Sequence, residues 1–264
     1  MAKEKAAADA GTIQPARPVV RKIGTADLKE ALSLGFADFK AMPTHLVFLF
    51  IIYPIVMVIV ARSFAGYEVL PAVFPLLAGY TLIGPLGAVA TYEMSRRREQ
   101  GLESSRRLAF EFFRLPSMPS VAALGALLMA VYFVWLGAAL ALYKFNFGWV
   151  APASIPDFAR QIFTTSSGWT LIVVGSGVGF IAAVIVFTLS VVSFPLLLDK
   201  NVGVVQAVQT SIRAVLANPV TMGIWGIVVA FLLLLGSLPF FVGLAVVLPT
   251  LGHATWHLYR RVVE

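Results

Sequence analysis

The 264-residue sequence contains no cysteine and few charged residues. The lack of cysteine excludes disulfide bonds, thiolate metal sites and cysteine nucleophiles. Charged residues make up 12% of the chain, against about 25% in soluble domains. Hydrophobic residues reach 59%, and the mean hydropathy is +0.88. Because so little charge cannot cover a globule in water, the composition excludes a soluble enzyme and predicts that the bilayer is the solvent for most of the chain.

The N-terminal residues, 1–24, also lack any long apolar run. They are rich in Ala, Lys and Pro, so they do not have the core of a secretory signal. We interpret them as a disordered cytoplasmic tail that precedes a single membrane domain over residues 25–264.

Apolar segments recur throughout the membrane domain, and a helix needs about 20 residues to cross a hydrocarbon core. The apolar stretch 220–259 is too long for one crossing, and Gly236-Ser-Leu-Pro239 near its midpoint is a turn signal. The fourth segment requires a strong tilt or a bend near Pro195. The sequence therefore predicts six spans, at about residues 46–65, 69–91, 121–143, 168–195, 220–236 and 238–259.

The net charge of +7 is distributed along the chain as a six-span protein requires. With the N-terminus inside, 17 of the 20 Lys and Arg fall in cytoplasmic segments, as the positive-inside rule expects. A five-span arrangement would move Arg260 and Arg261 outside and weaken this bias. The basic excess thus indicates membrane sidedness with both termini in the cytoplasm, and it argues against a nucleic-acid-binding patch.

Short segments ahead of the spans resemble one another. Residues 31–43 align without gaps with 207–219, at an offset of 176, and a third copy precedes Pro119. Residues 90–97 also align with 254–261. The matched apolar positions have the spacing of one helical face, namely Leu32, Phe36 and Phe39 with Val208, Ile212 and Val215, and Leu108, Phe112 and Leu115 in the third copy.

We interpret these segments as amphipathic helices at the cytoplasmic interface, each ending at the proline before a span. The predicted fold class is therefore all-α, a polytopic membrane protein of three hairpins with interfacial helices. The alternative is that prolines and arginines mark any membrane boundary, so that the similarity is convergent.

Three segments resemble a family. They are Phe194-Pro-Leu-Leu-Leu-Asp-Lys-Asn, the following Ala207–Pro219 segment, and Leu251-Gly-His-Ala-Thr-Trp-His-Leu-Tyr-Arg near the end. They are similar to a bacterial family of integral membrane proteins catalogued as domain of unknown function 2189. The resemblance extends over roughly residues 24–264. It implies a multi-pass protein of the bacterial inner membrane and supports six spans, but it implies no activity.

Ionisable side chains within the predicted spans are rare. No ionisable residue occurs in the second to sixth spans before Glu93, Asp199 and His253 near their cytoplasmic ends, so no mid-membrane carboxylate is available for ion coupling. His253 and His257 are spaced for one metal, although interfacial polar residues bonded to headgroups or backbone have the same spacing. Their position on one helix argues against a haem held between helices. We therefore expect no cofactor.

Two further sets of residues are candidates for contact. Gly175 and Gly179 lie on one ridge and predict close packing of a helix, either from this chain or from a second copy. A basic loop interleaved with phenylalanines predicts contact with anionic lipid, with an acidic soluble partner as the alternative. Its arginines are Arg96, Arg97, Arg98, Arg106, Arg107 and Arg114.

The expected function is that of a non-enzymatic scaffold, assembly or accessory protein that acts through helix packing and lipid or protein contacts. Its partners would be the anionic cytoplasmic leaflet and a larger membrane complex or further copies of the chain. The alternative is a permease for a small uncharged or amphipathic solute. A third interpretation, a metal- or haem-handling protein, depends on His253 and His257.

Overall fold

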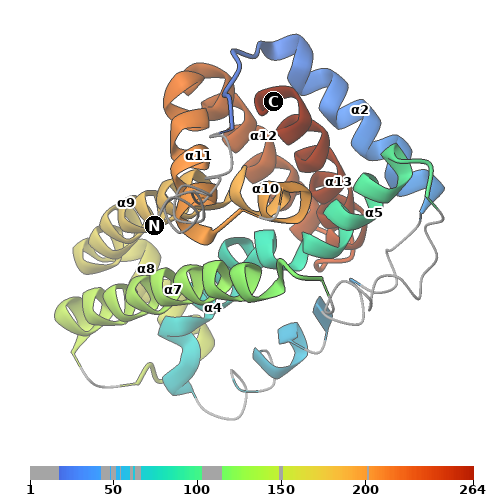
Figure 1. The fold of residues 1–264 in the computed structure, drawn as a ribbon. Helices are drawn as coiled ribbons and strands as arrows, with labels where there is room; N and C mark the ends of the chain where they lie inside the picture. Colours follow the sequence, from blue (N-terminus) through green and yellow to red (C-terminus); the bar gives the residue numbers. More distant parts are fainter. Residues whose placement is uncertain are drawn as a thin grey trace, which may run out of the picture.

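The computed structural model describes residues 18–42, 67–102, 115–148, 151–200 and 202–264, together with 48, 52–53, 55–59 and 62 (Figure 1). Most of these residues are helical, and Val20 and Val263 add an isolated antiparallel bridge. The helices are α2 (Thr25–Ala41), η1 (Tyr67–Val69), α4 (Leu70–Gly87), α5 (Val89–Glu99), α7 (Met118–Phe147), α8 (Ile155–Thr164), α9 (Ser166–Ser190), α10 (Ser193–Lys200), α11 (Val204–Ala217), α12 (Pro219–Ser237) and α13 (Leu244–Val262).

Three helical segments in the described part of the chain are long and apolar enough to cross a bilayer. They are Met118–Phe147, Ser166–Lys200 and Pro219–Ser237, with 30, 35 and 19 residues. Prolines lie in the first turns of α7 and α12, where a missing N–H costs no hydrogen bond. The all-α class and the presence of transmembrane helices are therefore confirmed. The first predicted span, 46–65, lies mostly outside the described residues.

Three other predicted spans are divided or displaced in the structure. The second, 69–91, is divided at residue 88 between α4 and α5. The fourth is divided at residues 191–192, so Pro195 lies in the first turn of α10. The sixth begins at Leu244 and not at 238, because a turn follows α12. Phe240 and Phe241 adopt left-handed conformations there, with φ of 49° and 64°. The turn signal at residues 236–239 is thus located correctly, but the turn is longer than the sequence indicates.

Residues 18–24, which the sequence places in the tail, pack against the body of the protein. The Arg21 N–H donates to the Val262 carbonyl at 2.8 Å, and the Glu264 N–H donates to Val19 at 3.0 Å. The Ile23 N–H donates to Oδ1 of Asn218 at 2.9 Å. The two ends of the described chain therefore lie side by side. The remainder of the predicted tail, 1–17, lies outside the described residues.

The aligned helices α2 and α11 bury side chains at equivalent positions of the alignment. The buried positions pair at the offset of 176 as Ala31 with Ala207, Gly35 with Ser211, and Asp38 with Ala214. This small-residue face of α2 packs on α13. The matching face of α11 packs on the end of α9, where the Ser211 hydroxyl donates to the Thr188 carbonyl and accepts from the Val192 N–H. The shared register supports a structural repeat.

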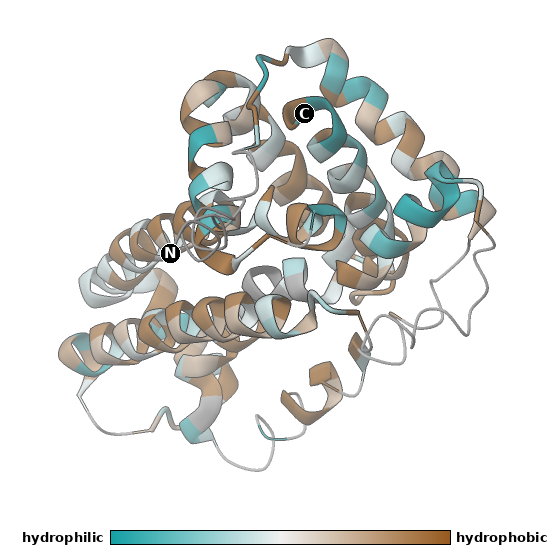
Figure 2. Ribbon diagram, viewed as in Figure 1, coloured by the Kyte–Doolittle hydropathy of each residue, from teal (hydrophilic) through white to brown (hydrophobic). Residues whose placement is uncertain are grey.

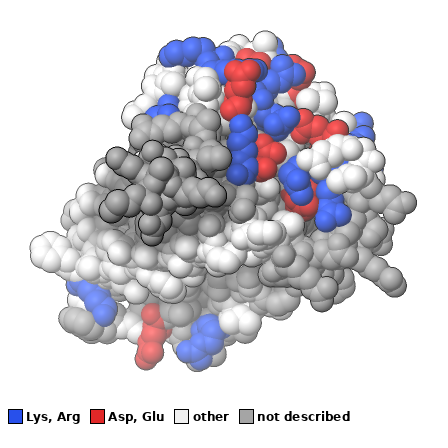
Figure 3. Space-filling view, in the orientation of Figure 1, with Lys and Arg blue, Asp and Glu red and all other residues white. Residues whose placement is uncertain are grey.

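Polar side chains gather at one end of the molecule. Hydrophilic residues concentrate on α2, α5 and the C-terminal part of α13, whereas α7 and α9 are mostly apolar (Figure 2). Charged side chains cluster over the same helices (Figure 3). We call the part formed by α2, α5 and residues 252–264 the charged end.

Candidate functional site

A buried carboxylate lies at the centre of the charged end. Asp38 is only 5% exposed, because it lies on the small-residue face by which α2 packs on α13. Its Oδ2 accepts hydrogen bonds from the Ser95 hydroxyl at 2.5 Å and from Nε2 of His257 at 2.9 Å. Its Oδ1 accepts from the Arg98 guanidinium at 2.8 Å. His253 joins through Nδ1, which lies 2.8 Å from Ser95 Oγ. These five residues form what we call the Asp38 network.

Two glycines allow the helices of the Asp38 network to approach closely. A Cβ at Gly35 would lie 2.5 Å from the backbone nitrogen of Ala254 on α13. A Cβ at Gly252 would lie 2.1 Å from Oγ1 of Thr91 on α5. Both distances are too short for a real side chain. The missing side chains therefore set the spacing at which α2, α5 and α13 bring the network together.

The surroundings of Asp38 favour its ionised form. Burial raises the pKa of Asp38, but the hydrogen bonds from His257 and Ser95 and the charges of both histidines outweigh it, so the pKa is lowered overall. An ionised carboxylate that accepts several hydrogen bonds also explains how a charge is held in a buried position.

The protons of the Asp38 network can be assigned from these contacts. Ionised Asp38 only accepts, so Ser95 gives its single proton to Asp38. Nδ1 of His253 must then be the donor to Ser95 Oγ. In a serine nucleophile the histidine instead accepts the proton of the serine. The geometry thus favours a structural role for Ser95, in joining the helices, over a role as an activated nucleophile. Nε2 of His253 is buried and has no hydrogen-bond partner among the described residues.

The lowered pKa of Asp38 predicts an acid-sensitive protein. A group whose pKa is lower in the folded state stabilises that state above its ordinary pKa, about 4, and loses this contribution as the pH falls through the folded-state value. We expect the melting temperature in a non-ionic detergent to fall as the pH drops below about 5. The fall should be smaller for Asp38→Asn, which should also melt lower at neutral pH. Parallel curves for the two proteins would contradict this assignment.

Ion pairs surround the Asp38 network. Glu93, 2% exposed, accepts from Arg96 and Arg97, each at 2.7 Å. Arg260 pairs with Glu99 and Arg261 with Glu30, and both pairs join different helices. The Trp256 indole and the Tyr259 hydroxyl add hydrogen bonds to Glu99 and to Asp199 on α10. Most basic residues of α5 and α13 are therefore matched by acidic residues of the same chain.

Six arginines were predicted to contact lipid or a partner. Those that the structure describes bind acidic residues of the same chain. Arg96 and Arg97 bind Glu93, and Arg98 binds Asp38 and the Ala37 carbonyl. Arg106, Arg107 and Arg114 lie outside the described residues. Lipid or partner contact by these six arginines stays a prediction.

The predicted packing ridge on α9 faces α7 of the same chain. A Cβ at Gly175 would lie 3.6 Å from Leu142, and one at Gly179 would lie 3.3 Å from Nε1 of Trp135. Trp135 is 6% exposed and is thus buried between the two helices. The partner of this ridge, which the sequence left open, is therefore an internal helix.

The two histidines lie close together, but their neighbours are Asp38 and Ser95 and not the ligands of a metal site. His257 binds Asp38 directly, and His253 reaches it through Ser95. Within the described ranges, no group of three or more His, Cys, Asp or Glu residues is placed to hold a metal ion. The helix face that suggested a metal thus contributes to the Asp38 network.

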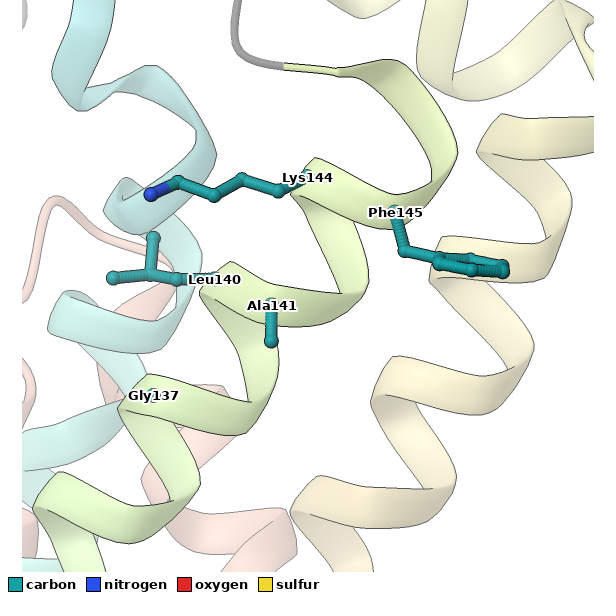
Figure 4. Close-up of a pocket in the computed structure, with 5 residues that line it drawn as sticks. All are labelled: Gly137, Leu140, Ala141, Lys144 and Phe145. Atoms are coloured by element: carbon teal, nitrogen blue, oxygen red, sulfur yellow. The ribbon is translucent and has the colours of Figure 1, made fainter.

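A second surface feature lies away from the charged end, on α7. A groove of about 510 Å³ is lined by Gly137, Leu140, Ala141, Lys144 and Phe145. Leu140 and Lys144 extend to one side of the helix and Phe145 to the other (Figure 4). Phe145 is 90% exposed, and the groove is open to its surroundings. We interpret it as apolar surface that faces lipid.

Sequence reasoning missed Asp38 and Ser95. A signal for Asp38 exists, because it occupies the position of Ala214 in the aligned helix and interrupts a stripe of small residues. A carboxylate in a stripe that packs against another helix requires a buried partner. Ser95 has no comparable signal, since serines are common at helix ends.

The fold and composition define an all-helical integral membrane protein. Residues 73–199 match the model of a family described as "Predicted integral membrane protein (DUF2189)", which confirms the family resemblance seen in the sequence. The match covers slightly less than half of the chain, and the segments at 207–219 and 251–260 lie outside it. No curated protein and no solved structure matches the chain. The family description includes no activity.

Proposed function

We propose that the protein is a non-enzymatic scaffold, assembly or accessory protein of the bacterial inner membrane. The observation that carries this proposal is the cross-linking of the charged end: the Asp38 network and its surrounding ion pairs hold α2, α5 and α13 together. A charged end that is held together in this way keeps the same surface in the free and bound protein, which suits a protein that acts through contact.

The proposed topology has six spans, with the charged end and both termini in the cytoplasm. The bias of Lys and Arg toward cytoplasmic segments supports this orientation. The proposal of three hairpins is supported by the position of α2, α5 and the polar part of α13 at the same end of the molecule (Figure 1). The first span would be 46–65, and α4 and α13 would provide the second and sixth.

The long helices provide the surface for contact within the membrane. Large apolar side chains of α9 and α12 point outward, including Phe180 at 69%, Ile181 at 60%, Ile227 at 70% and Phe231 at 61% exposed. In a bilayer these side chains meet lipid or the apolar helices of a partner. We propose that a larger membrane complex assembles on this surface.

Purification from native membranes after mild crosslinking tests this function. We expect recovery of a larger complex with a second membrane protein in a fixed ratio. Phe180→Ala/Ile181→Ala should reduce the recovered partner at least several-fold, because these side chains face outward and their removal spares the internal core. Phe163→Ala, a similarly exposed residue on α8, provides the matched control.

A different result would overturn the proposal. Recovery of a lone monomer or homodimer that moves a small solute across liposomes would favour the permease alternative. Full partner recovery with the α9 double variant would show that this surface is not the site of assembly.

A further inference from the structure

A second side of α2 is only partly covered by the rest of the protein, because Leu32 packs against the core at its edge while Lys29, Phe36 and Lys40 are exposed. It carries Lys29, Leu32, Phe36, Phe39 and Lys40, which lie next to one another at about 100° per residue. We call these five residues the lysine flank. Phe36 is 46% exposed and stacks on Phe39 with their ring centroids 6.4 Å apart. Nζ of Lys40 lies 5.0 Å from the centroid of the Phe36 ring.

The aligned helix α11 shows what such a flank faces. At the offset of 176, the lysine flank corresponds to Val205, Val208, Ile212, Val215 and Leu216. Val205 is 70% and Leu216 is 71% exposed, whereas Val208 and Val215 are half-buried against the core, so only the outer part of this side of α11 presents apolar surface. Exposed apolar surface on a helix beside membrane spans is typical of contact with the lipid boundary. Because both helices bury the same register, the lysine flank occupies the equivalent position.

The lysines occupy the two positions where α11 has its most exposed apolar residues. A lysine in such a place lays its apolar stem along the membrane boundary and extends its ammonium group to the headgroups. The charges of α2 are also divided between its sides, since Asp27 and Glu30 contact Arg261 on the opposite flank. Among the described residues, neither Lys29 nor Lys40 forms a salt bridge with a carboxylate.

We infer that the lysine flank of α2 binds the negatively charged phosphodiester headgroups of anionic phospholipids in the cytoplasmic leaflet. The two ammonium groups provide the charge complement, and Phe36 inserts among the headgroups beside Lys40. The inference uses the orientation proposed above, but it does not depend on the existence of a partner protein. It places lipid recognition on α2, whereas the sequence pointed to the arginines after α5.

The test compares lipids retained by the purified full-length protein. Protein is equilibrated in mixed micelles with equal amounts of phosphatidylglycerol and phosphatidylcholine, and bound lipids are quantified by mass spectrometry. We expect phosphatidylglycerol to be enriched in the wild type. Lys29→Gln/Lys40→Gln should lower the enrichment by about fivefold per lysine at the bound site. Lys144→Gln/Lys200→Gln removes the same net charge elsewhere and should leave the enrichment unchanged.

Three outcomes would overturn the inference. The first is equal enrichment in the wild type and the Lys29/Lys40 variant. The second is loss of enrichment when inorganic phosphate is added at constant ionic strength, because the flank would then bind a free anion. The third is that a soluble acidic protein co-purifies with the wild type but not with the variant, while the amount of bound lipid is the same for both. Folding of each variant is verified by its melting temperature and elution volume, since all four lysines are exposed.

A second measurement uses the absence of native cysteine. Single cysteines at Phe36 and Ile212 in anionic liposomes should react several-fold more slowly with a membrane-impermeant maleimide than a cysteine at Ala41, which is exposed on another side of α2. Equal rates at the three positions would contradict the placement of both flanks in the membrane boundary.

Discussion

Replacement of Asp38 with alanine is expected to destabilise the protein by about 3 to 5 kcal/mol, the usual cost of removing one partner from a buried charge network. The substitution would leave Ser95, His257 and Arg98 without their shared acceptor. Since the carboxylate is 5% exposed, water could not easily replace it. Reversible unfolding in a mild detergent, followed by intrinsic tryptophan fluorescence, measures the loss.

A control for this substitution lies on the same helix. Glu30 pairs with Arg261, but the two side chains are 49% and 42% exposed. Exposed ion pairs contribute about 1 kcal/mol or less, so Glu30→Gln should change stability only slightly. Equal effects of Asp38→Ala and Glu30→Gln would show that burial of the network does not set its contribution.

Replacement of Gly35 with alanine is the second large effect that we expect. The added Cβ would lie 2.5 Å from the backbone nitrogen and 2.6 Å from the Cα of Ala254. Backbone atoms cannot rotate away, so α2 must move off α13, and we expect a loss of about 1 to 3 kcal/mol or more. Faster amide hydrogen exchange across residues 25–41 would report the displacement of α2 directly.

Gly223 provides the matched control for Gly35. It lies in α12, and a Cβ built there meets no atom within 4 Å. Alanine in a helix interior is favoured over glycine by up to about 1 kcal/mol, so Gly223→Ala should be neutral or stabilising. If Gly35→Ala behaved in the same way, the close approach of α2 and α13 would not be a determinant of the fold.

The accurate sequence predictions concerned features that act locally. Pro119 and Pro219 occur in the first turns of long apolar helices, and the Gly236–Pro239 signal ends α12 at Ser237. The helix signals depend on the chemistry of a few neighbouring residues, which is the same in any fold. The turn after α12 was too short in the prediction because the left-handed backbone at Phe240 and Phe241 has no sequence signature.

The candidate site required information that no local pattern contains. Asp38 and Ser95 are 57 residues apart, and Ser95 and His253 are 158 residues apart. The spacing of His253 and His257 on one helix face was visible in the sequence and suggested a metal. Only the docking of α2 and α5 showed that a carboxylate and a serine lie beside these histidines.

By itself, the sequence determined that this is a helical membrane protein whose charges are confined to the ends of apolar segments. It could do so because transfer of each segment from water to lipid depends on the composition of that segment alone. The tertiary structure decided which charges neutralise one another, which ridge packs on which helix, and which flank of α2 is left for the membrane. Those outcomes depend on how closely the helices approach one another, and at the charged end the missing side chains of Gly35 and Gly252 permit that approach.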